Sequence, residues 1–168
     1  MATKTTEFNP DFKDAVVHEE GGERVKRCFQ CGLCTAACPV RDVNPAFNPR
    51  KIIHMVLLGM KDQVIKNDAV WLCSTCYSCQ ERCPQDVRVT ELMNALKNIA
   101  VKAGFPHPSQ KKQAELIYNS GRLYEIEEFD NRKRQRLGLP PLATKIEEIK
   151  VLYRQGGIES LVRPAEAK

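Results

Sequence analysis

The sequence contains no long apolar run. The longest candidate, Ile52 to Met60, is interrupted by His54 and includes Gly59, and it falls well short of the roughly 18 consecutive apolar residues of a membrane helix. Residues 1–7 include no apolar stretch of the kind that directs export. Only 7% of the residues are aromatic. We therefore expect no membrane span, a cytoplasmic location, and a compact centre with polar ends.

Cysteine is absent from three long stretches, residues 1–27, 39–72 and 84–168. All eight cysteines therefore lie in two short blocks. A disulfide framework would tie distant segments together, and such frameworks are typical of small secreted proteins. Clustered thiols in a chain with no export signal indicate metal binding instead.

The two cysteine blocks repeat one pattern, C-x2-C-x2-C-x3-C-P. The first block runs from Cys28 to Pro39 and the second from Cys73 to Pro84. In this spacing three cysteines converge on three irons of one cubane cluster, and the fourth cysteine binds the neighbouring cluster. We therefore predict two 4Fe–4S clusters as the cofactors.

The predicted ligand sets are crossed between the blocks, because the fourth cysteine of each is carried away on a helical turn and followed by proline. For cluster 1 they are Cys28, Cys31, Cys34 and Cys83. For cluster 2 they are Cys38, Cys73, Cys76 and Cys79. This exchange brings the two clusters close together, as electron transfer between them requires. The second block is the more polar one, so we expect unequal reduction potentials.

Zinc is the alternative metal, since eight cysteines can hold two zinc ions in paired C-x2-C sites. Zinc sites do not require a third cysteine two residues further on, nor a fourth that is followed by proline, in both blocks. A 3Fe–4S centre is usually associated with a missing or replaced cysteine, and neither block lacks one. The pattern therefore favours two 4Fe–4S clusters.

Helices are expected around both blocks, and the predicted fold class is all-α. Asn48 and Pro49 form a plausible N-cap and first-turn pair, and the apolar residues that follow have helical spacing. Residues 62–72 are compatible with a second helix. After the second block, Thr90 is a candidate N-cap for a helix that ends near Gly104. The expected architecture is the alpha-helical ferredoxin fold with helical extensions at both ends.

Beyond the cysteines, two segments carry a family resemblance. The spacer Asn44-Pro45-Ala46-Phe47-Asn48-Pro49-Arg50-Lys51 and the later Leu137-Gly138-Leu139-Pro140-Pro141 resemble the C subunit of heterodisulfide reductase. The cysteine blocks alone are shared with iron–sulfur subunits of succinate dehydrogenase, fumarate reductase and glycerol-3-phosphate dehydrogenase. The chain lacks the cysteine set of a 2Fe–2S domain and the adjacent cysteine pair of the catalytic B subunit, which favours the C subunit.

The resemblance implies a role in a hetero-oligomeric oxidoreductase. A flavin-containing A subunit would collect electrons, this chain would relay them, and a cysteine-rich B subunit would reduce a disulfide, which in methanogens joins coenzyme M and coenzyme B. No catalytic residue is predicted here, because all eight cysteines are assigned to clusters. A related oxidoreductase subunit, a free-standing ferredoxin-like carrier and an iron–sulfur sensor are the alternatives.

The formal charge of +5 does not indicate nucleic-acid binding. Each cube with four thiolates carries about −2 in its oxidised form, so two clusters leave the protein near neutrality. The basic run at residues 132–136 follows an acidic stretch at 125–130, and this order suits a solvated helix with i,i+4 ion pairs. We expect no nucleic-acid partner.

The predicted organisation has three parts. Residues 1–24 form an N-terminal extension, residues 25–104 form the two-cluster helical ferredoxin domain, and residues 105–168 form a helical extension suited to docking on a partner subunit. In the last part, Thr144 and Glu147 match a capping box for a helix over 144–155. The apolar stripe of this helix has little of its own chain to cover it, which suits docking on a partner. A helical cap that packs on its own chain is the alternative.

Overall fold

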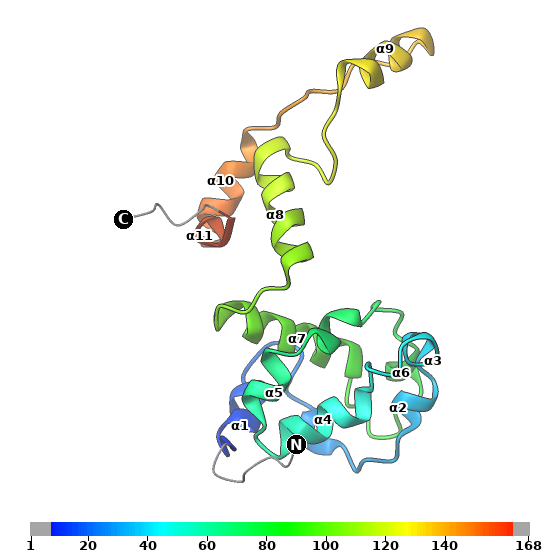
Figure 1. The fold of residues 1–168 in the computed structure, drawn as a ribbon, viewed down its shortest axis with the longest axis vertical. Helices are drawn as coiled ribbons and strands as arrows, with labels where there is room; N and C mark the ends of the chain where they lie inside the picture. The colour runs from blue at the N-terminus through cyan, green and yellow to red at the C-terminus, as the bar shows by residue number, and fades with distance from the viewer. Residues whose placement is uncertain (1–7, 163–168) are drawn as a thin grey trace. The chain divides into compact units, whose positions relative to one another are not determined.

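A computed structural model describes residues 8–162, and within this range the chain contains helices and no strand (Figure 1). The predicted all-α class is confirmed. The chain divides after Pro106 into two compact units. The helices of the first unit are α1 (Phe12–Val17), η2 (Val25–Arg27), α2 (Leu33–Ala36), α3 (Pro39–Val43), α4 (Pro49–Leu57), α5 (Lys61–Ile65), η3 (Asp68–Leu72), α6 (Ser78–Glu81) and α7 (Val89–Lys102). Those of the second unit are α8 (Pro108–Ser120), α9 (Glu128–Arg136), α10 (Glu148–Gln155) and α11 (Glu159–Val162).

The core of the first unit is built by α1, α4 and α7, and α1 contacts both of the other helices. Its fully buried side chains include Phe12 of α1, Ile53 of α4 and Leu92 of α7. Cys34 and Cys38 are buried in the same core. Helix α1 lies in the predicted N-terminal extension, and its apolar face is part of this core. The ends of the two predicted extensions, residues 1–7 and 163–168, lie outside the described residues.

Helix α4 forms where the sequence predicts it. The side chain of Asn48 accepts a hydrogen bond from the Lys51 backbone N–H at 3.0 Å, and Pro49 occupies the first turn. The helix ends before Gly59, whose φ of +78° is the left-handed conformation that glycine adopts without strain. A Cβ at this position would lie 2.2 Å from the Asn9 carbonyl oxygen, so a glycine is needed for the close approach of the segment before α1.

Two predictions about this unit are wrong in detail. The helix expected over residues 62–72 is interrupted, because the Asn67 side chain accepts a hydrogen bond from the Ala69 N–H at 2.8 Å and starts the separate helix η3. Thr90 is not the N-cap of α7. The helix begins at Val89 after Arg88, and Thr90 lies inside the first turn, 1% exposed.

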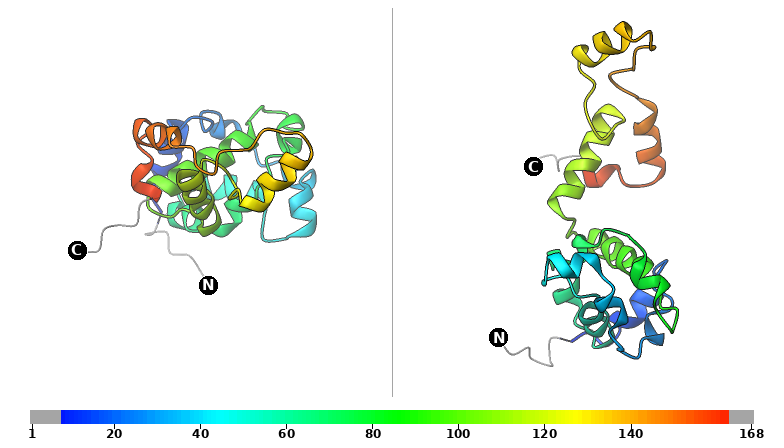
Figure 2. Two further views of the ribbon diagram at one scale, coloured as in Figure 1. Left: turned by 90° about the horizontal axis from the view of Figure 1, so that it is seen from above. Right: turned by 90° about the vertical axis from the view of Figure 1, so that its right-hand side faces the viewer.

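In the second unit, α8 packs against α10 and α11 (Figure 2). The rings of Tyr118 and Tyr153 lie 5.4 Å apart, and the Tyr118 hydroxyl donates to the Glu159 carboxylate at 2.7 Å. The capping box predicted at Thr144 does not form, because α10 begins only at Glu148. The residues before it are held in another conformation, in which Ile146 lies directly against Gly121.

Helix α9 has no buried residue. Its acidic first turn and basic last turn follow the predicted order, and Arg132 pairs with Glu128 at 3.8 Å, four residues apart. A pair between such exposed groups contributes little to stability. The charges are those of a solvent-facing helix. Across residues 8–162, no helix has both the length and the apolar character needed to cross a bilayer.

Candidate metal centres

The backbones of the two cysteine loops repeat one another. In the first loop Gln30 and Gly32 have positive φ angles of +64° and +87°, and in the second loop Thr75 and Tyr77 have +53° and +63°. Gly32 and Tyr77 each precede the short helix of their block, α2 or α6. Left-handed residues at matching places curl each loop around its cysteines, and non-glycine residues adopt this conformation at a cost.

The first loop encloses a chamber lined by cysteines from both blocks. These are Cys28, Cys31 and Cys34 of the first block and Cys83 of the second. The rest of the lining is mainly apolar and includes Ile53 of α4. The guanidinium-bearing side chain of Arg50 also lines this chamber and lies over Gly32.

The second chamber is built in the same way. Its cysteines are Cys73, Cys76 and Cys79 of the second block and Cys38 of the first. Phe47, Val89 and Met93 supply apolar walls, and each is almost completely buried. Val89 lines the first chamber as well, so its side chain is part of the wall of both chambers.

Packing of α2 against α6 brings the fourth cysteine of each block into the opposite chamber. Cys38 follows α2, and Pro39 begins α3 directly after it. Cys83 follows α6, and its Sγ accepts a hydrogen bond from the Val87 backbone N–H at 3.4 Å. Because both cysteines lie at the far ends of these short helices, neither loop completes its own set of four.

The cysteines differ in how far their side chains are exposed to solvent. The second cysteine of each block, Cys31 or Cys76, is exposed, whereas Cys34 and Cys38 are buried. Exposed side chains flank both outer cysteines: Phe29 and Leu33 stand beside Cys31, and Tyr77 stands beside Cys76. Each chamber therefore opens to solvent at one cysteine and is closed by the core on the other side.

Burial sets the acidity of the inner thiols. It raises the pKa of Cys34 to about 11 and also raises the pKa of Cys28 and Cys79. The exposed Cys76 behaves differently, since a hydrogen bond with the Ser78 hydroxyl lowers its pKa. A buried thiolate is costly without a compensating positive charge. Bound iron would supply that charge and favour the deprotonated form of each coordinating thiol.

The donor set of the chambers fits a polynuclear cluster, because each chamber is lined by four cysteines. Across residues 8–162 no three His, Cys, Asp or Glu side chains are grouped for a single metal ion. Four cysteines are the donor set of a 4Fe–4S cluster.

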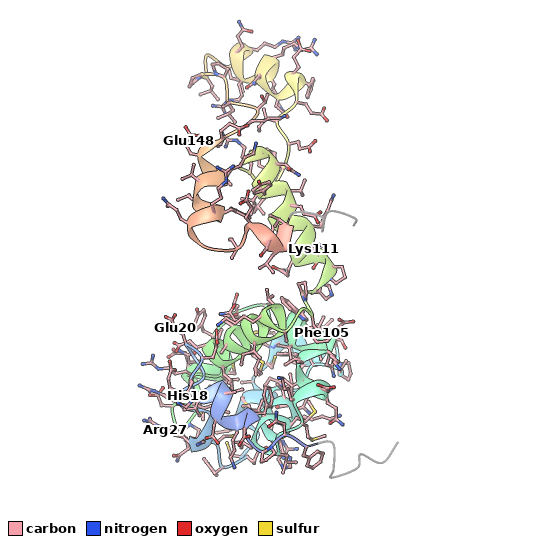
Figure 3. The ribbon with its side chains drawn as sticks, turned by 90° about the vertical axis from the view of Figure 1, so that its left-hand side faces the viewer. His18, Glu20, Arg27, Phe105, Lys111 and Glu148 are labelled. Carbon is pink, nitrogen blue, oxygen red and sulfur yellow. The ribbon has the colours of Figure 1, made fainter. Side chains whose placement is uncertain are left out.

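The histidines are not among the residues that line these chambers. His18 is exposed at the end of α1, where its ring lies 2.7 Å from the Asp14 carbonyl oxygen (Figure 3). His54 is exposed on α4, and His107 accepts from the Ser109 N–H at the start of α8. Sequence reasoning missed Arg50 and Thr90 as neighbours of the cysteines, because both reach them from helices outside the two cysteine blocks.

Comparison with known proteins agrees with this geometry. Residues 24–87 match the family described as a 4Fe-4S dicluster domain. The chain is 34% identical to the C subunit of the H(2):CoB-CoM heterodisulfide,ferredoxin reductase of Methanothermobacter thermautotrophicus, over 93% of this chain and 85% of that protein. It is also 34% identical to the second iron–sulfur C subunit of the CoB–CoM heterodisulfide reductase of Methanocaldococcus jannaschii, over 95% and 92% of the two chains. The C subunit of the ferredoxin:CoB-CoM heterodisulfide reductase of Methanosarcina mazei is 34% identical, over 82% of this chain and 89% of its own length.

Proposed function

Because this chain belongs to the family of heterodisulfide reductase C subunits, we propose that it is the non-catalytic electron relay of its complex. It passes electrons from a flavin-containing A-type subunit to a disulfide-reducing B-type subunit. In a methanogen, the final acceptor is the disulfide of coenzyme M and coenzyme B. The clustered free thiols suit the reducing conditions of the cytoplasm, where we expect the complex to operate.

The crossed cysteine sets are the observation that carries this proposal. We assign Cys28, Cys31, Cys34 and Cys83 to cluster 1, on the lining of the first chamber. We assign Cys38, Cys73, Cys76 and Cys79 to cluster 2, on the lining of the second. The two sets share the wall at Val89 and open to solvent at Cys31 and Cys76. Two adjacent clusters, each reached from solvent at a different cysteine, are suited to receive electrons at one and release them at the other.

The protein's own residues bind and shield the electron carriers. Each cluster, when bound, takes up and releases one electron at a time. The thiolates hold the irons, and buried side chains such as Ile53, Phe47 and Met93 exclude water from the inner walls. A rigid, water-poor surrounding keeps the structural response to each electron small. All eight cysteines are used in this arrangement, so reduction of the disulfide takes place on another subunit.

The second unit supports a docking role for residues 105–168. Five of its large apolar side chains are between 60% and 67% exposed: Leu123, Tyr124, Phe129, Leu137 and Leu152. Phe129 lies on α9 and Leu152 on α10, whereas Leu123 and Tyr124 lie between α8 and α9 and Leu137 follows α9. Exposed large apolar side chains are typical contacts of protein–protein interfaces. We propose that this extension holds the chain in its complex, while residues 25–104 carry the clusters.

Anaerobic purification of the native complex tests the relay. The expected result is about eight irons per copy of this chain, from two cubes, together with copurified flavin and cysteine-rich subunits identified by mass. Zinc in place of iron, without a visible chromophore, would exclude the relay. A monomeric protein with full iron content that donates electrons in solution would identify a free carrier instead.

Substitution tests the docking extension separately. Phe129→Asp and Leu137→Asp place a charge on the exposed apolar side chains and should reduce copurification of the partners without loss of iron. Gln135→Asp is the matched control, because it adds the same charge at an exposed polar position of α9. Equal losses of partner in all three variants would count against a specific apolar contact.

A further inference from the structure

The third cysteines of the two blocks differ in their hydrogen-bonding environment. Cys34 and Cys79 occupy equivalent positions, and each has a threonine hydroxyl near its sulfur. Thr35 Oγ1 lies 4.0 Å from Cys34 Sγ, and Thr90 Oγ1 lies 3.5 Å from Cys79 Sγ. Each hydroxyl thus lies near a cysteine sulfur. Its effect on that sulfur depends on which atom accepts the hydrogen bond that the hydroxyl donates.

The hydroxyl of Thr35 donates its hydrogen bond to a residue other than Cys34. It donates to Asn48 Oδ1 at 3.0 Å and accepts from the Arg50 backbone N–H, also at 3.0 Å. The same Asn48 oxygen caps α4 through Lys51. A hydroxyl has a single proton to donate. Thr35 therefore ties its loop to the start of α4 and has no proton left for Cys34.

The hydroxyl of Thr90 has a cysteine sulfur as its hydrogen-bond partner. Thr90 is only 1% exposed, and among the described residues the hydrogen-bond partner of its hydroxyl is Cys79 Sγ. A thiolate bound to iron carries no proton, so in the loaded protein the hydroxyl must be the donor. A buried hydroxyl without a partner would be costly, which favours this hydrogen bond further.

We propose that Thr90 is a positioning residue whose hydroxyl donates a hydrogen bond to the Cys79 thiolate and raises the reduction potential of cluster 2. The reduced cluster carries one more negative charge than the oxidised one, and this charge is spread over its sulfurs. A hydrogen bond to sulfur therefore stabilises the reduced state more than the oxidised state. The inference rests on the ligand assignment proposed above.

A redox titration of the anaerobic holoprotein, followed by electron paramagnetic resonance, tests this role. Thr90→Val keeps the branched shape and removes the hydroxyl, so one of the two midpoint potentials should shift downward while the other stays. Thr90→Ser restores a hydroxyl and should return the potential toward that of the wild type. Thr90→Ala serves as a second apolar variant that introduces no new steric contact. Loss of cluster 2 from both apolar variants, with retention in Thr90→Ser, would also identify the hydroxyl as the feature that supports Cys79.

Thr35→Val is the matched variant in the first block. This change should weaken the attachment of α4 without lowering either reduction potential, because the Thr35 hydroxyl of the wild type donates its hydrogen bond to Asn48 and not to Cys34. Unchanged potentials in Thr90→Val at full iron content would overturn the inference and leave the relay untouched. An equal downward shift in Thr35→Val would also overturn it. Iron content well below eight per chain in the wild type would contradict the cluster assignment itself.

Discussion

Cys83 lines the same chamber as Cys28, although the two residues belong to different cysteine blocks. The same exchange brings Cys38 into the chamber of Cys73. Neither block can thus complete a set of four cysteines unless α2 and α6 are packed together. We therefore expect cluster binding and folding of the first unit to be coupled, so that a change in one block affects the other.

Loss of Cys83 should damage cluster 1 rather than cluster 2. Cys83→Ala is expected to lower the iron content from about eight to about four per chain, measured by metal analysis. The double variant Cys28→Ala/Cys83→Ala should lose no more iron than either single variant, because both changes affect one cluster. Cys73→Ala/Cys83→Ala should lose both clusters. The opposite pattern of the two double variants would show that each block holds its own cluster.

Removal of the Asn48 side chain should destabilise the first unit. The side chain of Asn48 caps α4 and accepts a hydrogen bond from the Thr35 hydroxyl. Asn48→Ala is expected to cost about 1 kcal/mol or somewhat more of the free energy of unfolding, measured by denaturant titration of the anaerobic protein. Asn98→Ala is the control, since Asn98 is exposed within α7 and alanine favours the helix. Equal losses in both variants would mean that the cap contributes nothing.

Gly59→Ala should detach the segment that precedes α1. The new Cβ would lie 2.2 Å from the Asn9 carbonyl oxygen at a φ of +78°, and the Asn9 N–H donates to the Gly59 carbonyl at 2.8 Å. The expected cost exceeds the roughly 1–2 kcal/mol of the left-handed conformation alone. Gly138→Ala has a similar φ of +68° with nothing within 4 Å, and it isolates the conformational cost. Thermal unfolding should rank Gly59→Ala as the more damaging change.

Removal of iron by a chelator under anaerobic conditions should unfold the two units unequally. Cys34 and Cys38 are part of the first unit's core, so that core depends on the clusters. The second unit contains no cysteine and is held by contacts such as that between Tyr118 and Tyr153. Hydrogen exchange should therefore rise in α4 and α7 and stay nearly constant in α8. Equal loss of protection in all three helices would contradict this separation.

The type of cofactor and the start of one helix can both be predicted from local sequence. The spacing of the cysteines predicts the cofactor, because residues that lie two or three apart on one loop reach the same cluster wherever that loop is placed. Asn48 and Pro49 predict the start of α4 for a similar reason, since a cap needs only the backbone of the next turn. Family membership agrees with the predicted cofactor, and the hydrogen bond at Asn48 agrees with the predicted start of the helix.

Tertiary structure decided the features in which distant segments meet. Thr90 is suited by type to cap a helix, yet it lies inside α7, where its hydroxyl contacts Cys79 on another helix. The helix predicted from Thr144 starts only at Glu148, and Ile146 before it lies against Gly121 of a distant segment. Arg50 reaches the first chamber only through the packing of α4 against α2. The sequence alone thus determined the type of cofactor and where its candidate ligands lie along the chain. Packing of separate helices decided what surrounds each sulfur, because such contacts depend on distances that sequence spacing does not contain.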